Sequence, residues 1–175
     1  MSGAAPVGRQ PADAIRDVGP FDCVALYGVP LPRCSGEELH HIVVLRLQSE
    51  APEDAQGRFL HVDFAPPAGL RCQRTGDAAV PKARLIGSGE CPRPVDGARI
   101  AAVLDVWTRR GRVSHYSDTA SFAEDMLKAC DVFAVYADHF QTVNARLKDW
   151  HVERSSERER QMAAASAAAI GAALL

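Results

Sequence analysis

The sequence SFAEDMLKACDVFAVYADHFQTVNARLKDW, at residues 121–150, holds the pattern that decides the fold. Large or apolar side chains recur in it at alternating steps of four and three residues, which keeps them on one side of an α-helix. The spacing therefore predicts one helix over 121–150 with a continuous apolar stripe. The members of this stripe are Phe122, Met126, Ala129, Phe133, Tyr136, Phe140, Val143, Leu147 and Trp150.

The start of this helix and its length lead to further expectations. Ser121 precedes Glu124 by three residues, as in a capping box, so we expect the helix to begin there. An unbroken helix to Trp150 would be ~43 Å long, which exceeds the width of a domain of this size. It should therefore break or bend between Asp138 and Asn144, or project and pack on a partner. The stripe itself can cover this chain's own sheet or form a seam with a second copy.

A second helix is predicted over residues 97–110. Asp96 is a suitable N-cap, basic residues occupy the last turn, and Gly111 follows as a C′ residue. Its apolar residues fall at helical spacing, at Ile100, Val103, Leu104 and Trp107.

Strands are predicted at residues 21–27, 41–47 and 58–64, from runs rich in β-branched and aromatic residues. Residues 83–86 are a candidate edge strand. The polar loop at 49–57 favours an antiparallel pairing of the second and third strands, with Leu47 near Phe59. In that register His41 shares a face with His61 and Asp63, although a slip of one residue would reverse the faces.

The remaining segments show no clear periodic spacing of apolar residues. Residues 66–94 are rich in proline and glycine and predict loops, and 112–117 form a short β-like segment. Residues 1–20 predict a flexible arm, and 151–175 are charged and then alanine-rich, as in a terminal helix or tail. The chain is therefore expected to be a single α+β domain over 21–150. Its antiparallel sheet would be covered by two main helices, 97–110 and 121–150.

Composition restricts the partners. With 175 residues, a net charge of −2 and a pI near 6.3, the chain lacks the basic field that nucleic acid requires. Residues 1–20 contain no continuous apolar core, which argues against a secretory signal, and 161–175 are too short and alanine-rich to span a membrane. Five cysteines, none of them in C-x-x-C spacing, suggest free thiols. We expect a cytoplasmic protein whose partner is a small molecule or another protein.

Four residues could carry chemistry: Cys130 as a nucleophile, His41 as its base, and His61 or Asp63 to orient that base. Alternatively, His41, His61 and Asp63 could bind a metal ion through three nitrogen or oxygen ligands, although no H-E-x-x-H motif accompanies them. No nucleotide-binding or serine-hydrolase motif occurs, and we expect no cofactor.

The order of these residues resembles permuted papain-like hydrolases of the NlpC/P60 type, in which a His-bearing strand precedes a Cys-bearing helix. Within that layout the chain resembles a group of small uncharacterised fungal proteins over about residues 38–140. The matching segments are His40-His41-Ile42-Val43, Leu60-His61-Val62-Asp63, 101–111 with Arg112 and Tyr116, and Ala129-Cys130-Asp131. The resemblance implies a Cys–His hydrolase or transferase, active or degenerate.

The position of Cys130 favours a different interpretation. If Ser121 caps the helix, Cys130 lies about two and a half turns in, where the helix dipole no longer lowers a thiol pKa. It also adjoins the apolar stripe at Ala129, as a core cysteine would. We therefore expect a non-catalytic binding or accessory protein, with the Cys–His enzyme as the alternative.

Overall fold

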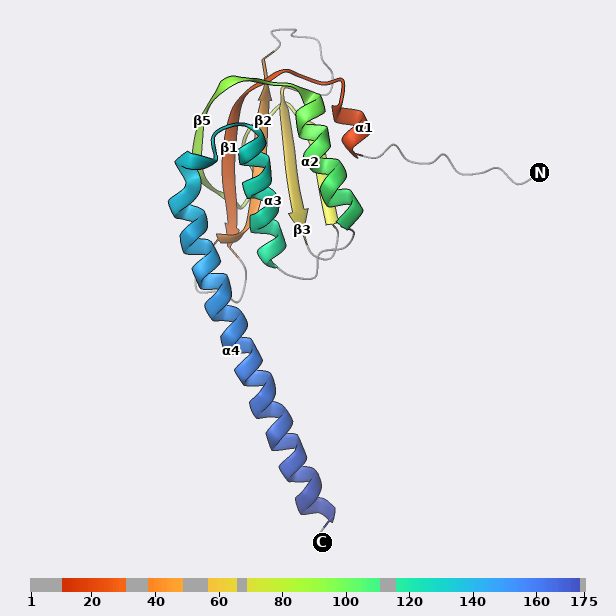
Figure 1. Cartoon of the computed structure of the whole chain (residues 1–175), viewed down its shortest axis with the longest axis vertical. Helices are drawn as coiled ribbons and strands as arrows, with labels where there is room; N and C mark the ends of the chain where they lie inside the picture. The colour runs from red at the N-terminus through yellow and green to blue at the C-terminus, as the bar shows by residue number, and fades with distance from the viewer. Residues whose placement is uncertain (1–10, 31–37, 49–56, 66–68, 111–115, 174–175) are drawn as a thin grey trace, which may run out of the picture.

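The computed structural model describes residues 11–30, 38–48, 57–65, 69–110 and 116–173. These residues form a single α+β domain built on a five-stranded antiparallel sheet, with helices along one face of it (Figure 1). The elements in chain order are α1 (Pro11–Ile15), β1 (Phe21–Pro30), β2 (Glu38–Leu47), β3 (Phe59–Ala65), β4 (Gly69–Thr75), β5 (Arg84–Val95), α2 (Gly97–Arg110), α3 (Tyr116–Ala129) and α4 (Phe133–Ala173).

The sheet has the strand order β4-β3-β2-β1-β5. The predicted strands at 21–27, 41–47 and 58–64 are present as β1, β2 and β3, and β2 pairs with β3 in antiparallel fashion. Residues 84–86 belong to an edge strand, as expected, but that strand continues to Val95. The prediction of loops over 66–94 was wrong for residues 69–75 and 84–94, which belong to β4 and β5, whereas 76–83 do form a loop. The scattered glycines and prolines hid two edge strands.

The predicted register of β2 and β3 was wrong by one residue. Arg46, not Leu47, lies opposite Phe59, so Ile42 faces Asp63 and Val44 faces His61. Since side chains alternate across a strand, this shift places His41 on the helix-covered face, and His61 and Asp63 on the other face. Packing of the apolar residues Val43, Leu45, Leu60 and Val62 beneath the helices fixes this register.

Helices α2 and α3 lie across one face of the sheet, and α4 starts beside them near β5 (Figure 1). Three rings form the centre of this layer: Phe64 of β3, Trp107 of α2 and Phe122 of α3, with centroids 4.9–5.7 Å apart. The indole Nε1 of Trp107 also donates to Asp125 at 3.0 Å, which ties α2 to α3. The predicted helix at 97–110 is confirmed residue for residue as α2.

The prediction of one helix over 121–150 was wrong, because the chain turns sharply between α3 and α4. The amide of Asp131 donates to the carbonyl of Lys128, and that of Val132 to the carbonyl of Leu127, both at 3.1 Å. This is the Schellman pattern of a helix C-terminus, with Asp131 in the left-handed conformation at φ 58°. The apolar spacing continues across the turn, so the break was not visible in the sequence pattern, and it lies before the 138–144 region expected for it.

The predicted helix start at Ser121 was also wrong. Because α3 begins at Tyr116, Ser121 lies inside the helix, and Glu124 accepts from the Asn144 side chain of α4 at 3.0 Å instead of capping α3. The helix also overlaps the end of the segment at 112–117 expected to be β-like; the rest of that segment, and Gly111, lie outside the described residues.

The N-terminal segment is more ordered than predicted over its second half. Within the expected flexible arm at 1–20, residues 11–15 form α1, and Ala12 and Ile15 are buried in the core; 1–10 lie outside the described residues. A Cβ atom at Gly97 would collide with the carbonyl oxygens of Ile15 and Val18, so glycine at the start of α2 permits this close approach.

The first part of α4 packs on the domain and the remainder leaves it (Figure 1). Tyr136, Phe140, Val143 and Leu147 are all buried, so this part of the stripe covers the chain's own sheet and is not left as a seam for a second copy. The ring of Tyr136 lies over β5, where a Cβ at Gly87 would approach it to 3.0 Å. No helix in the described part of the chain is both long and apolar enough to span a membrane.

Candidate functional site

The structure does not bring the four predicted site residues together. His41 of β2 lies opposite Gly28 of β1, whereas Cys130 contacts Cys91, beside the opposite end of β1 where Cys23 pairs with Glu90. The five residue steps from Cys23 to Gly28 span roughly 16 Å of strand. His61 and Asp63 lie on the other face of the sheet, so no arrangement of these four side chains forms a catalytic triad.

His41 is instead paired with a histidine of α4. Its Nε2 atom lies 2.9 Å from Nε2 of His139, and its ring packs against Phe140 with centroids 5.2 Å apart. His41 is fully buried. Burial, with smaller contributions from His139 and His40, lowers the pKa of His41 to about 3. The ring is therefore neutral at physiological pH, and it anchors α4 to β2.

A second polar cluster lies on the face of the sheet opposite the helices and includes His40, which was not among the predicted site residues. His40 Nε2 is 2.8 Å from Oδ2 of Asp63, and Arg71 of β4 donates to both oxygens of that carboxylate. Burial alone would raise the pKa of Asp63, but the hydrogen bonds from His40 and Arg71 outweigh it and lower that pKa. The correct register would have selected His40, because it shares the face of Asp63 whereas His41 does not.

His61 belongs to neither cluster. Its Nε2 atom lies 2.9 Å from the backbone oxygen of Asp77, in the segment that joins β4 to β5. Among the described residues, no three His, Cys, Asp or Glu side chains converge in a way that could hold a metal ion. The ligand set of His41, His61 and Asp63 considered from the sequence is divided between the two faces of the sheet.

Cys130 lies in the turn between α3 and α4, in a contact with Cys91 of β5. The two thiols lie next to each other, with a hydrogen bond between them as a cause of their pKa shifts, and Cys130 is fully buried. That hydrogen bond and burial both raise the pKa of Cys130 above its usual value, which opposes formation of a nucleophilic thiolate. Cys130 is thus a core residue at the end of a helix.

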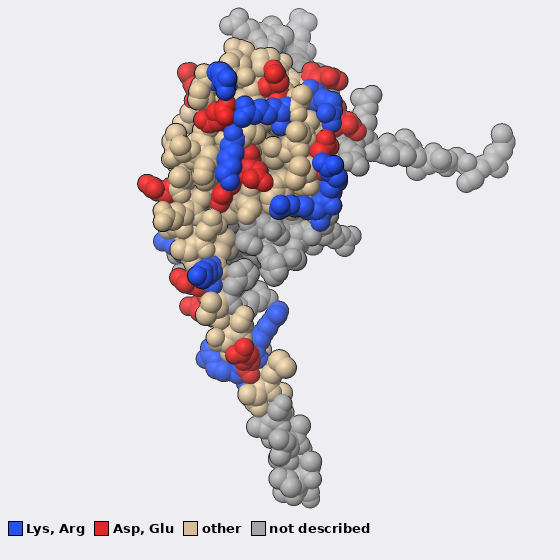
Figure 2. All heavy atoms as spheres, viewed as in Figure 1, with Lys and Arg blue, Asp and Glu red and all other residues tan. Residues whose placement is uncertain are grey.

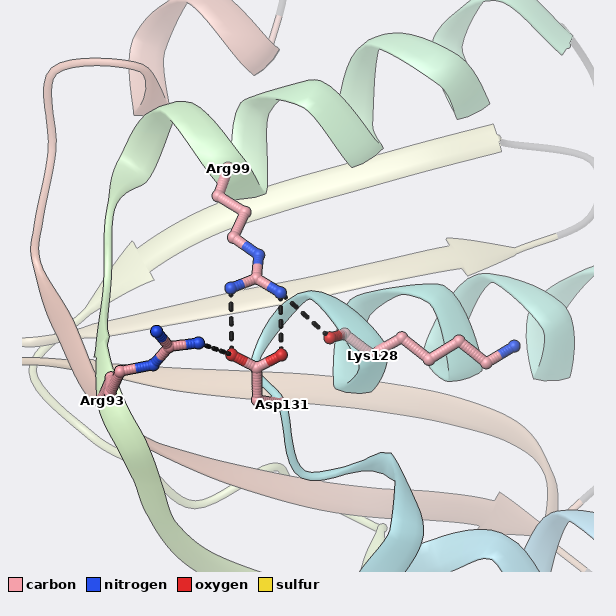
Figure 3. Close-up of polar contacts among 4 residues, drawn as sticks. All are labelled: Arg93, Arg99, Lys128 and Asp131. Carbon is pink, nitrogen blue, oxygen red and sulfur yellow. Dashed lines mark hydrogen bonds and ion pairs between the residues drawn. The ribbon is translucent and has the colours of Figure 1, made fainter.

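The residue after Cys130 fixes this turn to two other elements. The guanidinium of Arg99 in α2 donates to both carboxylate oxygens of Asp131, at 3.0 and 2.9 Å, and Arg93 of β5 approaches it to 3.4 Å (Figure 3). Arg99 also reaches the carbonyl oxygen of Lys128, whose own side chain points away from the cluster (Figure 3). These contacts lower the pKa of Asp131, with the hydrogen bond from Arg99 as the main cause. The start of α4 is therefore held in place by β5 and α2.

The remaining feature is the part of α4 beyond the domain, residues 148–173, which we call the arm. Every side chain described between 152 and 165 is exposed. On the face that Figure 2 shows, acidic and basic side chains are interspersed along it, and their signs alternate in the sequence from Glu153 to Arg160. Local contacts join some of them: Glu157 accepts from Gln161 at 3.1 Å and approaches Arg160 at 3.8 Å.

Comparisons with protein families, with curated proteins and with solved structures found no match to this chain.

Proposed function

We propose that this protein is a non-catalytic binding or accessory protein of a cytoplasmic pathway, in which the domain holds the arm of α4 for recognition by a partner protein. The observation that carries this proposal is that α4 continues for 26 residues beyond Leu147, roughly 39 Å, with its described side chains exposed. The free thiols among the described cysteines agree with a reducing compartment.

The physical argument concerns what stabilises a helix outside a domain. An isolated helix of this length is only marginally stable in water, because most helical stability in proteins comes from tertiary packing. The arm contains strong helix formers and i, i+3 and i, i+4 pairs, each worth about 0.2–0.5 kcal/mol. These contacts keep the arm helical but leave its surface available, as in the helices that dock into a groove of a partner.

The charge of the arm indicates the class of partner. Between 152 and 165 the sequence contains three glutamates and three arginines, so this segment has no net charge. A nucleic acid or an anionic membrane would select a basic surface. A mixed surface with exposed apolar residues, Val152 at 59% and Met162 at 72%, is better suited to a protein.

The enzyme alternative requires a reactive Cys130 beside a histidine. In this chain both groups have other partners, Cys91 and His139 respectively. The alternative therefore makes a separate prediction that can be tested on the same protein: native Cys130 should react with iodoacetamide at neutral pH, and His41→Ala should abolish that reaction.

Site-specific photo-crosslinking tests the binding proposal. A benzophenone amino acid placed at Met162 should give an adduct of one defined mass in the cells that make this protein. The same group at Val135, which is 81% exposed on the docked part of α4, should not. Glu157→Lys with Glu159→Lys should abolish the adduct, whereas Glu90→Lys on β5 should leave it unchanged. Absence of an adduct from positions 152, 156 and 162 would contradict the proposal, as would His41-dependent labelling of Cys130.

A further inference from the structure

Two thiols from distant parts of the sequence meet where α4 begins. Cys91 lies on the edge strand β5 and packs against the core, while Cys130 is the last residue before the left-handed turn at Asp131. The two side chains lie next to each other, and in this structure both are free thiols.

The surrounding contacts hold the two thiols in this position. Arg93 lies two residues beyond Cys91 on β5, and it contacts Asp131, the residue after Cys130 (Figure 3). Asp131 is in turn held by both guanidinium nitrogens of Arg99. Asp131 thus ties the turn beside Cys130 to β5 and to α2.

We propose that Cys91 and Cys130 are a modification site for hydroperoxides, which convert the pair into a reversible disulfide that joins β5 to the start of α4. Cys91 is the attacking thiol, because it is partly exposed whereas Cys130 is fully buried. Cys130 is the resolving thiol, since it is already in contact with the Cys91 sulfur.

The reaction has two steps. The Cys91 thiolate attacks one oxygen of hydrogen peroxide, so that a sulfur–oxygen bond forms, the oxygen–oxygen bond breaks, and the released hydroxide takes up a proton to become water. Cys130 Sγ then attacks the sulfenic sulfur of Cys91; the sulfur–sulfur bond forms, the sulfur–oxygen bond breaks, and the leaving hydroxide takes the proton of Cys130 as a second water. Two electrons pass from the thiols to the peroxide, and a dithiol reductant reverses the change.

The ionisation of Cys91 agrees with its role as the attacking thiol. The hydrogen bond from Cys130 lowers the pKa of Cys91, which favours its thiolate, while the same bond and burial raise the pKa of Cys130. The other described cysteines are less suited: burial raises the pKa of Cys23, and burial raises that of Cys72 to about 11.

Peptide mapping of the purified full chain tests this site. The reduced protein is treated with hydrogen peroxide, its remaining thiols are blocked with N-ethylmaleimide, and its digest is compared with and without reductant by mass spectrometry. The expected product is a peptide pair that contains Cys91 and Cys130 and separates on reduction. Cys23→Ser and Cys72→Ser should still form it, and Cys91→Ser should not.

The disulfide should also raise the thermal unfolding midpoint by roughly 5–10 °C, because it closes a long loop in the unfolded chain. This rise should be absent from Cys91→Ser, whose change lies at a partly exposed position and leaves the buried Cys130 intact. A Cys23–Cys91 disulfide, sulfinic acid at Cys91 with Cys130 still reduced, or no oxidation of Cys91 would each overturn the proposal. Since none of these readouts involves the arm, they are independent of whether α4 binds a partner.

Discussion

The two parts of α4 belong to one helix but are stabilised in different ways. In the docked part, Tyr136, Phe140, Val143 and Leu147 are buried, and each fully buried side chain of this size contributes about 1.5–3 kcal/mol. In the arm, helix propensity and exposed pairs of a few tenths of a kcal/mol replace that packing. A continuous helix can therefore contain one part that stabilises the fold and one that contributes little to it and is available for binding.

The largest expected effect comes from the docked part. Phe140 is 1% exposed and contacts both Phe133 and His41, so Phe140→Ala should lower the free energy of unfolding by about 3–5 kcal/mol. Val135→Ala, at an exposed position five residues earlier, is the matched control and should change it by less than about 0.5 kcal/mol. Urea denaturation measures both. A loss below about 1 kcal/mol for Phe140→Ala would contradict the packing of α4 on the sheet.

A pH titration tests the histidine contact that anchors the docked part. The pKa of His41 falls from 6.5 to about 3 on folding, so between these pH values the unfolded chain binds a proton at His41 and the folded chain does not. The stability that neutral His41 contributes is therefore fully present above pH 6.5 and is lost as the pH falls toward 3. Between neutrality and pH 5 this loss should reach about 2 kcal/mol, because only the unfolded chain binds the proton.

The matched variant for this titration is His41→Leu, which cannot bind the proton. Its free energy of unfolding should lack that slope between pH 6.5 and pH 5 when measured by urea denaturation at each pH. Persistence of the full slope in His41→Leu would assign it to other groups.

A smaller effect is expected at the joint that separates α3 from α4. Asp131 adopts φ 58°, which is unfavourable for any residue with a side chain, so Asp131→Ala keeps that cost and also loses the contacts to Arg93 and Arg99. Asp131→Ala should therefore lower the thermal unfolding midpoint. Asp131→Gly relieves that conformation while losing the same contacts to Arg93 and Arg99, and it should be the more stable of the two. Equal thermal midpoints for the two variants would show that the backbone conformation is not what matters here.

The smallest effect on global stability should come from the arm itself. Ending the chain after Trp150 should change the free energy of unfolding of the domain by less than about 0.5 kcal/mol, since the described side chains it removes are exposed. In the full chain, amides of the arm should exchange with deuterium much faster than those of residues 136–147. Protection of the arm equal to that of the docked part would mean that it is covered in solution.

The predicted site shows that the alternation of apolar residues can locate strands without determining their register. Apolar alternation located β2 and β3 correctly, but it did not determine which residue of one strand lies opposite a given residue of the other. An error of one residue was enough to join His41 with Asp63 in the prediction, whereas the folded chain joins His40 with Asp63. The contact of Cys91 with Cys130 could not be inferred either, because β5 lay in a segment without a recognisable period.

By itself, the sequence determined the α+β class, three central strands, the helix at 97–110 and the apolar stripe of 121–150, since each depends on local spacing that any window of the chain displays. Tertiary structure decided where the long helix breaks. Asp131 has no intrinsic preference strong enough to end a helix, and it holds its left-handed conformation beside two arginines from β5 and α2. It also decided the register of β2 and β3, because that choice depends on which faces the helices bury.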